Sequence, residues 1–342
     1  MNKFLKKINK KDLIYYIGLI IILLLNIIKL DYEIYSPGDL INLEDRIDVE
    51  NAYESKGSIN LTYVTSRSGY LTNILLSYII PTWDLVSLDD SRIENESEKE
   101  IFERNKILLK ETSYDAIISA FDAANISYEV KNINLVVTYI FEGSDTDLKI
   151  GDTIKEINGK TITSMDDISN EISNYKENDK INIKVLRNDK LIDCYSVLRN
   201  EYNKLIIGIF ISKLKDIETT PKVEYIFKDS ESGSSRGLMC ALDIYNKITE
   251  KDITKGKIIS GTGTIDDKGN VGSIAGVKYK IIGADKNKAD IFIVPKDNYE
   301  EALKAKKDNN LKIEIISVST LNELIEKLEN WFYQFFYFEV VY

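Results

Sequence analysis

The chain has 342 residues, of which 44% are hydrophobic and 29% charged, a composition typical of a globular protein with two or three domains. It contains no histidine, which excludes a Ser-His-Asp or Cys-His catalytic apparatus and any zinc or haem site built on imidazole. Cys194 and Cys240 are too few for a disulfide framework, and we expect both to be buried. A net charge of −10 argues against nucleic-acid binding, and we expect neither a metal nor a cofactor.

The first thirty residues have the pattern of a membrane anchor. Five lysines precede an uncharged run, mostly Ile and Leu, from Leu13 to Ile28. Extended to Leu30, about 18 residues at ~1.5 Å each span roughly 27 Å, just enough for a bilayer core. We therefore predict that 1–30 are a cytoplasmic tail and a single transmembrane helix in the cell membrane, with the remaining chain outside the cytoplasm. A cleaved signal peptide is the alternative, but no small-residue cleavage site follows the run.

Residues 31–112 form an N-terminal ectodomain segment in this interpretation. They hold short β-like runs, such as Ile47–Val49 and Ser58–Thr65, in which apolar residues alternate. A further apolar patch, Leu71–Ile80, ends at a proline. We assign this segment no chemistry.

Residues 113–200 alternate between helical and strand patterns. An amphipathic helix is expected at 113–126, with Ser113 as its N-cap. Asn158-Gly159 predicts a two-residue hairpin turn. The other expected elements are strands at 127–131, 135–141, 153–157, 181–186 and 191–198 and a helix at 165–175. Together they predict a small α+β or partly open barrel module.

The stretch from Glu142-Gly-Ser-Asp to Leu148-x-Ile-Gly-Asp152 and on to Ile157-Asn-Gly-Lys160-x-Ile162 resembles a bacterial PDZ domain. The resemblance implies a groove between strand 135–141 and helix 165–175 that takes an extended peptide as an added strand. It also implies that a loop formed by Ile133, Asn134, Leu135 and Val136 receives the peptide carboxylate. The alternative is a module that only spaces or orients its neighbour.

Two glycine-containing motifs resemble nucleotide-binding loops and fall short of them. Gly159-Lys160-Thr161 ends like a phosphate-binding loop, but the required first glycine is Ile154. Gly261-Thr262-Gly263 lacks the third glycine of a dinucleotide loop. We expect no nucleotide site.

Residues 201–330 predict a mixed α/β domain of about 130 residues. The expected strands are 205–211, 223–227, 258–265, 291–294 and 311–318, and the expected helices are 235–248, 277–288, 299–306 and 321–328. With the preceding module, the fold class is a multidomain chain of α/β and α+β parts.

Two helix starts in this domain carry candidate chemistry. Gly233-Ser-Ser235-Arg-Gly237 places small residues where a strand passes into a helix. Lys280 falls in the first turn of the later helix, where the macrodipole disfavours its charge, and desolvation would lower its pKa further. Without histidine, lysine is the natural base for a serine nucleophile. A helix-capping serine is the alternative interpretation.

Both stretches resemble the proteolytic domain of the Lon family, which uses a Ser-Lys dyad. The resemblance implies that Ser235 is the nucleophile and Lys280 the general base, with Lys278 a weaker candidate. It assigns Thr262, in Ser260-Gly-Thr-Gly263, to a hydrogen bond with the lysine. The patterns Gly269-x-Val-Gly272-x-Ile-x-Gly276 and Ala289-Asp-Ile-Phe-Ile-Val-Pro295 also fit.

The sequence departs from the family pattern on either side of Ser235. Ser234 replaces a proline and Arg236 replaces an alanine. We expect the charge of Arg236 to depress the pKa of Lys280 further or to narrow the substrate pocket. Backbone N–H groups around Gly233 and Ser235 are expected to form the oxyanion hole.

The order of segments resembles that of the membrane-anchored, PDZ-containing Lon-like proteases of Gram-positive bacteria. This implies an ATP-independent serine endopeptidase that acts on extracytoplasmic peptides or unfolded segments and can form a homo-oligomeric ring. The alternative function is an inactive, PDZ-containing peptide-binding scaffold. Residues 331–342 are an aromatic tail, too short to span a membrane, after a last helix expected to end near Asn330.

Overall fold

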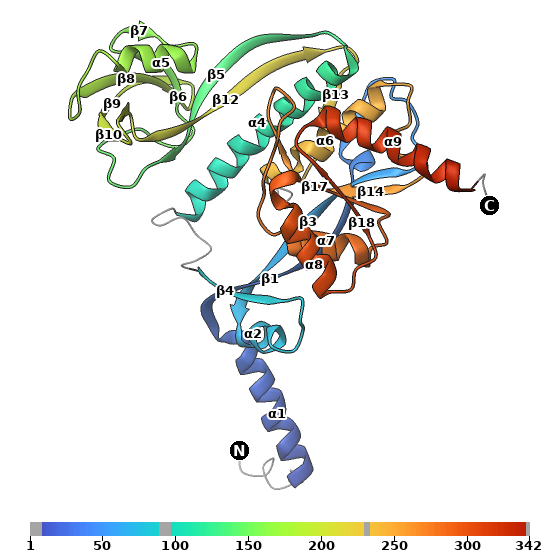
Figure 1. Cartoon of the computed structure of the whole chain (residues 1–342). Coiled ribbons are helices and arrows are strands. Elements are labelled where there is room, and N and C mark those ends of the chain that lie inside the picture. Colours follow the sequence, from blue (N-terminus) through green and yellow to red (C-terminus); the bar gives the residue numbers. More distant parts are fainter. Residues whose placement is uncertain (1–8, 89–96, 229–232, 340–342) are drawn as a thin grey trace.

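The computed structural model describes residues 9–88, 97–228 and 233–339. It contains a main domain built on a central sheet and a peripheral module, residues 128–219. The first and last strands of the module form a long two-stranded ribbon that joins it to the main domain (Figure 1). The N-terminal helix α1 (Lys10–Ile27) projects away from the main domain (Figure 1). The architecture is a mixed α/β multidomain fold.

The central sheet has six strands in the order β18–β17–β14–β3–β1–β4. Strands β18, β17, β14 and β3 run parallel, whereas β1 is antiparallel to both β3 and β4. The N-terminal segment, predicted as a separate ectodomain segment, thus supplies three strands of the same sheet. The strand bounds are β1 Lys29–Asn42, β3 Ser58–Tyr70, β4 Asp84–Ser87, β14 Ile258–Gly261, β17 Ile291–Pro295 and β18 Glu314–Val318.

Helices cover both faces of this sheet. On one face lie α4 (Glu98–Ala124), α6 (Gly237–Ile248) and α9 (Leu321–Glu339), and on the other α7 (Val277–Lys286) and α8 (Tyr299–Asp308). Strand β17 shows the division, because Ile291 and Ile293 enter the first core whereas Phe292 enters the second. Alternate side chains of a strand point to opposite faces, so a strand buried on both faces is apolar throughout.

The peripheral module has its own sheet and its own apolar core. The sheet order is β12–β5–β6–β8–β9, with β7 paired to β6. The predicted hairpin turn at Asn158-Gly159 is present between β6 and β7, and both residues have positive φ, as a type I′ turn requires. The bounds are β5 Tyr128–Ile140, β6 Thr153–Ile157, β7 Lys160–Thr161, α5 Met165–Ile172, β8 Lys180–Arg187, β9 Lys190–Val197, β10 Arg199–Glu201, β11 Lys204–Ile206 and β12 Ile209–Thr219.

The module is inserted into the main domain through two connectors. Helix α4 leads into β5, and β12 leads back into β13 (Val223–Tyr225), which pairs with β2 (Ile47–Val49). Strands β5 and β12 pair along their whole length, so the two predicted strands 127–131 and 135–141 form one continuous strand. The remaining elements are η2 Leu43–Asp45, α2 Leu71–Ser77, η3 Ser234–Arg236, β15 Thr264–Ile265, β16 Val271–Gly272 and η4 Lys296–Asn298.

Two predicted helix ends differ from the structure. Helix α4 begins after Ser97, whose hydroxyl and main chain form a capping box with Glu100. Ser113 therefore lies inside a helix instead of capping one, and its hydroxyl donates to the Leu109 carbonyl oxygen. At the other end of the chain, α9 continues to Glu339 instead of ending near Asn330.

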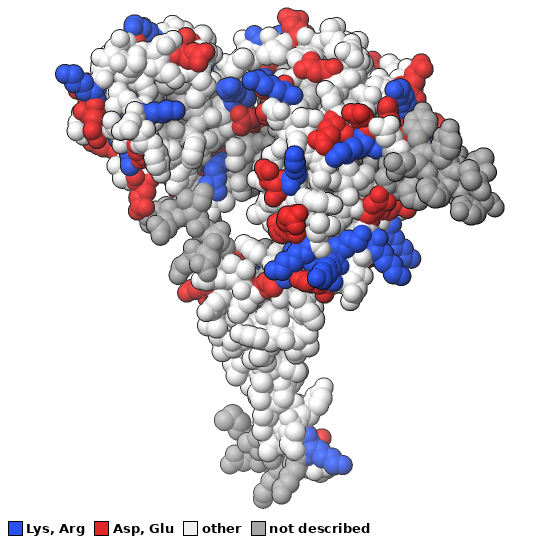
Figure 2. Space-filling view, in the orientation of Figure 1, with Lys and Arg blue, Asp and Glu red and all other residues white. Residues whose placement is uncertain are grey.

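The predicted transmembrane helix is wrong. Helix α1 has 18 residues, and three charged residues, Lys10, Lys11 and Asp12, form its first turn. Its uncharged part, Leu13–Ile27, is about 22 Å long at ~1.5 Å per residue. This length is shorter than a bilayer core of about 30 Å. Within the described ranges, no helix combines the length and apolarity of a membrane span. Beyond its first turn the helix surface is nearly free of charge (Figure 2). Residues 1–8 of the predicted tail lie outside the described residues.

Candidate active site

Ser235 lies in the short turn η3 that leads directly into α6. Gly233, which precedes the turn, has φ +132°, a backbone region that L side chains rarely adopt. A Cβ atom on Gly237 would lie 2.8 Å from Cγ2 of Thr112 in α4. The two glycines therefore allow the turn to form and to sit against α4.

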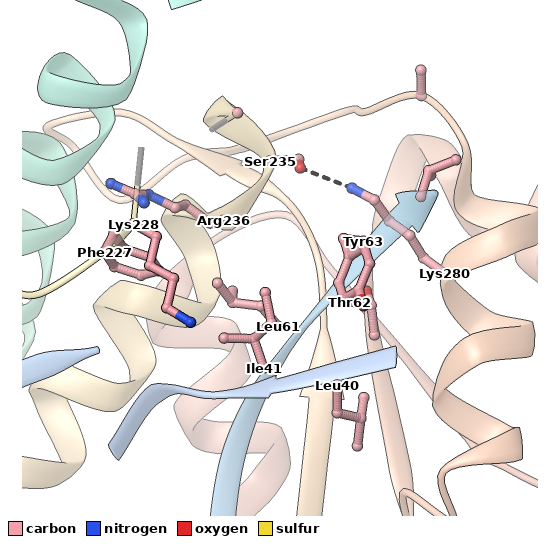
Figure 3. Close-up of a pocket in the computed structure, with 13 residues that line it drawn as sticks. Leu40, Ile41, Leu61, Thr62, Tyr63, Phe227, Lys228, Ser235, Arg236 and Lys280 are labelled. Carbon is pink, nitrogen blue, oxygen red and sulfur yellow. Dashed lines mark hydrogen bonds between the residues drawn. The ribbon is translucent and has the colours of Figure 1, made fainter. Parts of the chain in front are cut away.

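Lys280 reaches Ser235 from α7, on the other side of the turn (Figure 3). Its side chain is buried, with 4% of its surface exposed. Its Nζ donates to Oγ of Ser235 over 2.8 Å and to Oγ1 of Thr262 over 2.9 Å. The structure thus brings together three residues that the sequence singled out. Ser235 lies 45 positions and Thr262 18 positions before Lys280 in the chain.

Burial lowers the pKa of Lys280 from 10.5 to about 8. Desolvation disfavours the ammonium form because the interior solvates a charge less well than water does. Desolvation is the cause of this shift. The Arg236 side chain extends away from Lys280 (Figure 3) and donates to Ser113 in α4. The expected electrostatic effect of Arg236 on Lys280 is therefore not found, and a lysine of this pKa can act as a base near neutral pH.

Thr262 joins the loop after β14 to the turn that carries Ser235. Its Oγ1 donates to the Ser235 carbonyl oxygen over 3.0 Å while accepting from Lys280. Next to it, the Gly263 N–H also donates to the Ser235 carbonyl, over 2.9 Å, and the Gly263 carbonyl accepts from the Leu238 N–H. These bonds fix Ser235 relative to the sheet.

Lys278 lies apart from Ser235. Its Nζ donates to Oδ2 of Asp84 in β4 over 2.6 Å, and the Tyr279 hydroxyl donates to the same oxygen. The Lys278 amine is therefore occupied at the outer side of α7, and of the two lysines only Lys280 contacts the serine.

Ser235 and Lys280 line a cavity of about 590 Å³ (Figure 3). One wall comes from strands β1 and β3, in the segment to which the sequence assigned no chemistry. Alternating apolar residues at Ser58–Thr65 indicated a strand, but nothing local indicated that this strand borders the site. The apolar lining residues from that segment and from the chain before η3 are Leu40, Ile41, Leu61, Val64 and Phe227.

The four residues predicted to form a carboxylate-binding loop do not form a loop. Ile133, Asn134, Leu135 and Val136 lie in the middle of β5, and all four pair with β12. Leu135 and Val136 pair with β6 on the other side as well. The backbones of Leu135 and Val136 are therefore engaged on both edges, so no strand can be added beside these two residues, whereas Ile133 and Asn134 pair with β12 on one edge.

Two family models match consecutive parts of the chain and meet at residue 194, within β9 of the peripheral module. Residues 194–330 match the family model of the Lon protease (S16) C-terminal proteolytic domain. Residues 126–194 match the family model of the PDZ domain. The module up to residue 194 is thus PDZ-like, whereas its last strands and the main domain after them are Lon-like, and the Lon match supports a protease.

Two curated relatives are Lon proteases. The Lon protease of the Aster yellows witches'-broom phytoplasma is 30% identical over 98 residues, which cover 29% of this chain and 12% of the relative. Lon protease 2 of Borreliella burgdorferi is 28% identical over 127 residues, which cover 36% of this chain and 16% of the relative. The chain thus spans less than a fifth of either relative.

Among solved structures, the PDZ domain of an SdrC-like protein from Listeria monocytogenes is similar to part of this chain. It shows 24% identity and a TM-score of 0.22, covering 24% of this chain and 92% of that domain.

Proposed function

We propose that this chain is a serine endopeptidase that cleaves peptides or unfolded protein segments without ATP. Ser235 is the nucleophile and Lys280 the general base. The observation that carries the proposal is the 2.8 Å hydrogen bond between a buried lysine of lowered pKa and a serine hydroxyl on a cavity wall. The match to the Lon proteolytic domain over residues 194–330 supports the same reaction class.

The reaction proceeds through an acyl-enzyme. Lys280 Nζ, as the neutral amine, takes the proton from Ser235 as Oγ attacks the carbonyl carbon of the peptide bond. The resulting ammonium returns this proton to the leaving amine when the C–N bond breaks. Lys280 then takes a proton from a water molecule that attacks the ester, and Ser235 leaves with that proton as the free hydroxyl.

The neighbouring groups orient the pair. Thr262 Oγ1 holds the Lys280 amine beside Ser235, which limits the rotation of a long side chain. We assign the oxyanion hole to the backbone N–H groups around Gly233 and Ser235, at the start of η3. The apolar residues of the cavity wall favour an apolar substrate side chain next to the cleaved bond.

The peripheral module is proposed to select or position the substrate. Its site for an extended segment cannot lie beside Leu135 and Val136, because β6 and β12 occupy both edges of β5 there. Assembly into a homo-oligomeric ring stays a prediction.

The proposal is tested on the full chain with a pool of unstructured peptides, without nucleotide and then with added ATP. Cleavage is expected without nucleotide and unchanged with ATP. Ser235→Ala and Lys280→Ala should each abolish it. Ser234→Ala is the matched control for the first variant, because Ser234 is the neighbouring hydroxyl in the same turn. Lys278→Ala is the matched control for the second.

A fluorophosphonate probe adds a readout that does not depend on finding a substrate. Peptide mapping should locate the label on Ser235, and Lys280→Ala should slow the labelling. Unlabelled Ser235 in a folded chain that also cleaves no peptide would contradict the proposal and favour the inactive scaffold.

A further inference from the structure

Arg236, the residue after the proposed nucleophile, contacts both connectors of the peripheral module and also borders the cavity. Its side chain is buried, with 7% of its surface exposed. Its Nη2 donates to Oγ of Ser113 in α4, the connector that enters the module, over 3.0 Å. Its guanidinium carbon lies 3.7 Å from the ring centroid of Phe227, which follows β13. The same carbon lies 5.9 Å from the ring centroid of Tyr225, the last residue of β13.

The two connectors are also tied to each other at this point. The Tyr225 hydroxyl donates to the main-chain oxygen of Ser113 over 2.9 Å. The Ser113 hydroxyl donates its proton to the Leu109 carbonyl oxygen, so its oxygen is free to accept the hydrogen bond from Arg236. The guanidinium therefore lies in a corner, formed by the Ser113 hydroxyl oxygen and the rings of Tyr225 and Phe227, that the hydrogen bond between the two connectors holds in place.

The opposite side of the turn faces Lys280 and Thr262. Figure 3 shows the Arg236 side chain extending from the turn on the side away from Lys280, whose side chain reaches Ser235 from α7. We propose that Arg236 is a positioning residue that fixes this turn to α4 and to the chain at β13, so that Ser235 Oγ stays within hydrogen-bonding reach of Lys280. This inference rests on the proposed function.

An arginine suits this corner better than a lysine. The planar guanidinium stacks on a ring and donates from its edge at the same time, whereas an ammonium is a compact point charge. Lysine at this position should therefore restore the charge without restoring the placement of the turn.

The proposed action is mechanical and leaves the acid-base behaviour of Lys280 unchanged. Burial of the amine is the cause of the lowered pKa of Lys280. Removal of Arg236 should therefore lower kcat without moving the pH at which activity rises. A direct electrostatic effect of Arg236 on the base would move that pH instead.

The experiment compares Arg236→Ala, Arg236→Lys and Ser113→Ala with the unaltered full chain in peptide cleavage. Arg67→Ala is the matched control, because Arg67 also stacks on an aromatic ring, that of Trp83, and donates to a serine hydroxyl, that of Ser36. We expect kcat to fall about 10- to 100-fold in Arg236→Ala, since an ångström of misplacement costs on this order. We expect KM and the pH midpoint to stay within about twofold of their original values and Arg67→Ala to retain full kcat. Millimolar guanidinium should restore part of the lost rate.

Hydrogen exchange measures the turn without relying on activity. Backbone amides of 233–238 should exchange faster in Arg236→Ala and Ser113→Ala than in the unaltered chain and in Arg67→Ala. Unchanged exchange in both variants would overturn the inference whatever the activity. Unchanged kcat in both, with an active parent, would overturn it as well. An inactive parent with the faster exchange would instead count against the proposed function while keeping the positioning role.

Discussion

Lys278 and Lys280 lie two residues apart at the start of α7 and reach opposite environments. The Lys278 amine pairs with Asp84, and both of these side chains remain about a third exposed. The Lys280 amine is buried against Ser235 and Thr262. Adjacent helical positions differ by about 100° around the axis, so residues two apart face nearly opposite directions. Helix geometry therefore separates the two lysines that sequence spacing alone left as alternatives.

Replacing Lys280 by methionine should stabilise the fold while abolishing cleavage. The pKa of Lys280 is about 8 in the folded chain and 10.5 in its ordinary state, a difference equivalent to about 3 kcal/mol. Two lost hydrogen bonds offset part of this, at about 1 kcal/mol each. We expect the free energy of unfolding at pH 7 to rise by about 1 kcal/mol, measured by urea denaturation.

The pH dependence of that gain provides its control. Below pH 8 both the folded and the unfolded chain hold the Lys280 proton, so the cost of burying the charge is fully present. Between pH 8 and 10.5 only the unfolded chain holds it, so the stability of the parent rises with pH. The difference between Lys280→Met and the parent should shrink across this window. A difference that stays constant from pH 7 to 10 would mean that Lys280 is not buried as an ammonium.

Activity should depend on the same proton. The rate kcat/KM with an uncharged peptide should rise about tenfold per pH unit below pH 8 and level off above it, because only the neutral amine can accept the serine proton. The measurement is initial cleavage rates from pH 6 to 10, with folding followed by circular dichroism. A flat profile over this range would contradict a lysine base.

Thr262 should contribute to catalysis and stability through the hydrogen bonds of its Oγ1 atom. Thr262→Val keeps the shape and removes the acceptor of the Lys280 hydrogen bond and the donor to the Ser235 carbonyl. We expect kcat to fall about tenfold and stability to fall by about 1 to 3 kcal/mol, because a buried amine loses one partner. Thr262→Ser, which keeps the hydroxyl, is the matched variant and should retain most of the rate. Equal rates for the two variants would assign Thr262 to packing alone.

The residues of the candidate site were predicted from the sequence because each lies in a short motif that resembles the Lon family pattern. Ser235, Thr262 and Lys280 follow glycine-containing turns or a helix start, and such turns leave a recognisable pattern. Their hydrogen bonds then join η3, the loop after β14 and α7, which all follow the peripheral module in the chain. The sequence named desolvation as a cause of a lowered Lys280 pKa, but it could not show that the side chain is buried, since burial depends on the whole fold.

The cavity wall formed by strands β1 and β3 could not be predicted from local sequence motifs. Strand β3 pairs with β14, and Ser58 lies opposite Ile258, 200 residues later, with the peripheral module between them. A local alternation of apolar residues shows that a strand exists but carries no information on its partner. The same limit applied to Ser113, which resembles an N-cap yet lies inside α4. It hydrogen-bonds Arg236, 123 positions later.

Lys215 should hold the base of the peripheral module to the main domain. This buried lysine of β12 donates to Asp115 in α4 over 2.6 Å and to Asp267, between β15 and β16, over 2.9 Å. Burial raises the pKa of Asp115 to about 6, although Lys215 acts in the opposite direction. Lys215→Met leaves these carboxylates without their cation, which should cost about 3 kcal/mol of unfolding free energy at pH 7.

The cost of Lys215→Met should become smaller at low pH. Without the lysine, the pKa of Asp115 rises further above its ordinary value of 3.8, so the folded variant takes up a proton that the unfolded chain does not hold. The stability of the variant therefore increases as the pH falls from 7 towards 5, measured by urea denaturation. Lys131→Met is the matched control, because Lys131 pairs with Glu218 on the exposed surface of the same β5–β12 ribbon and its loss should leave stability unchanged. If both variants behave alike, Lys215 does not hold the two parts together.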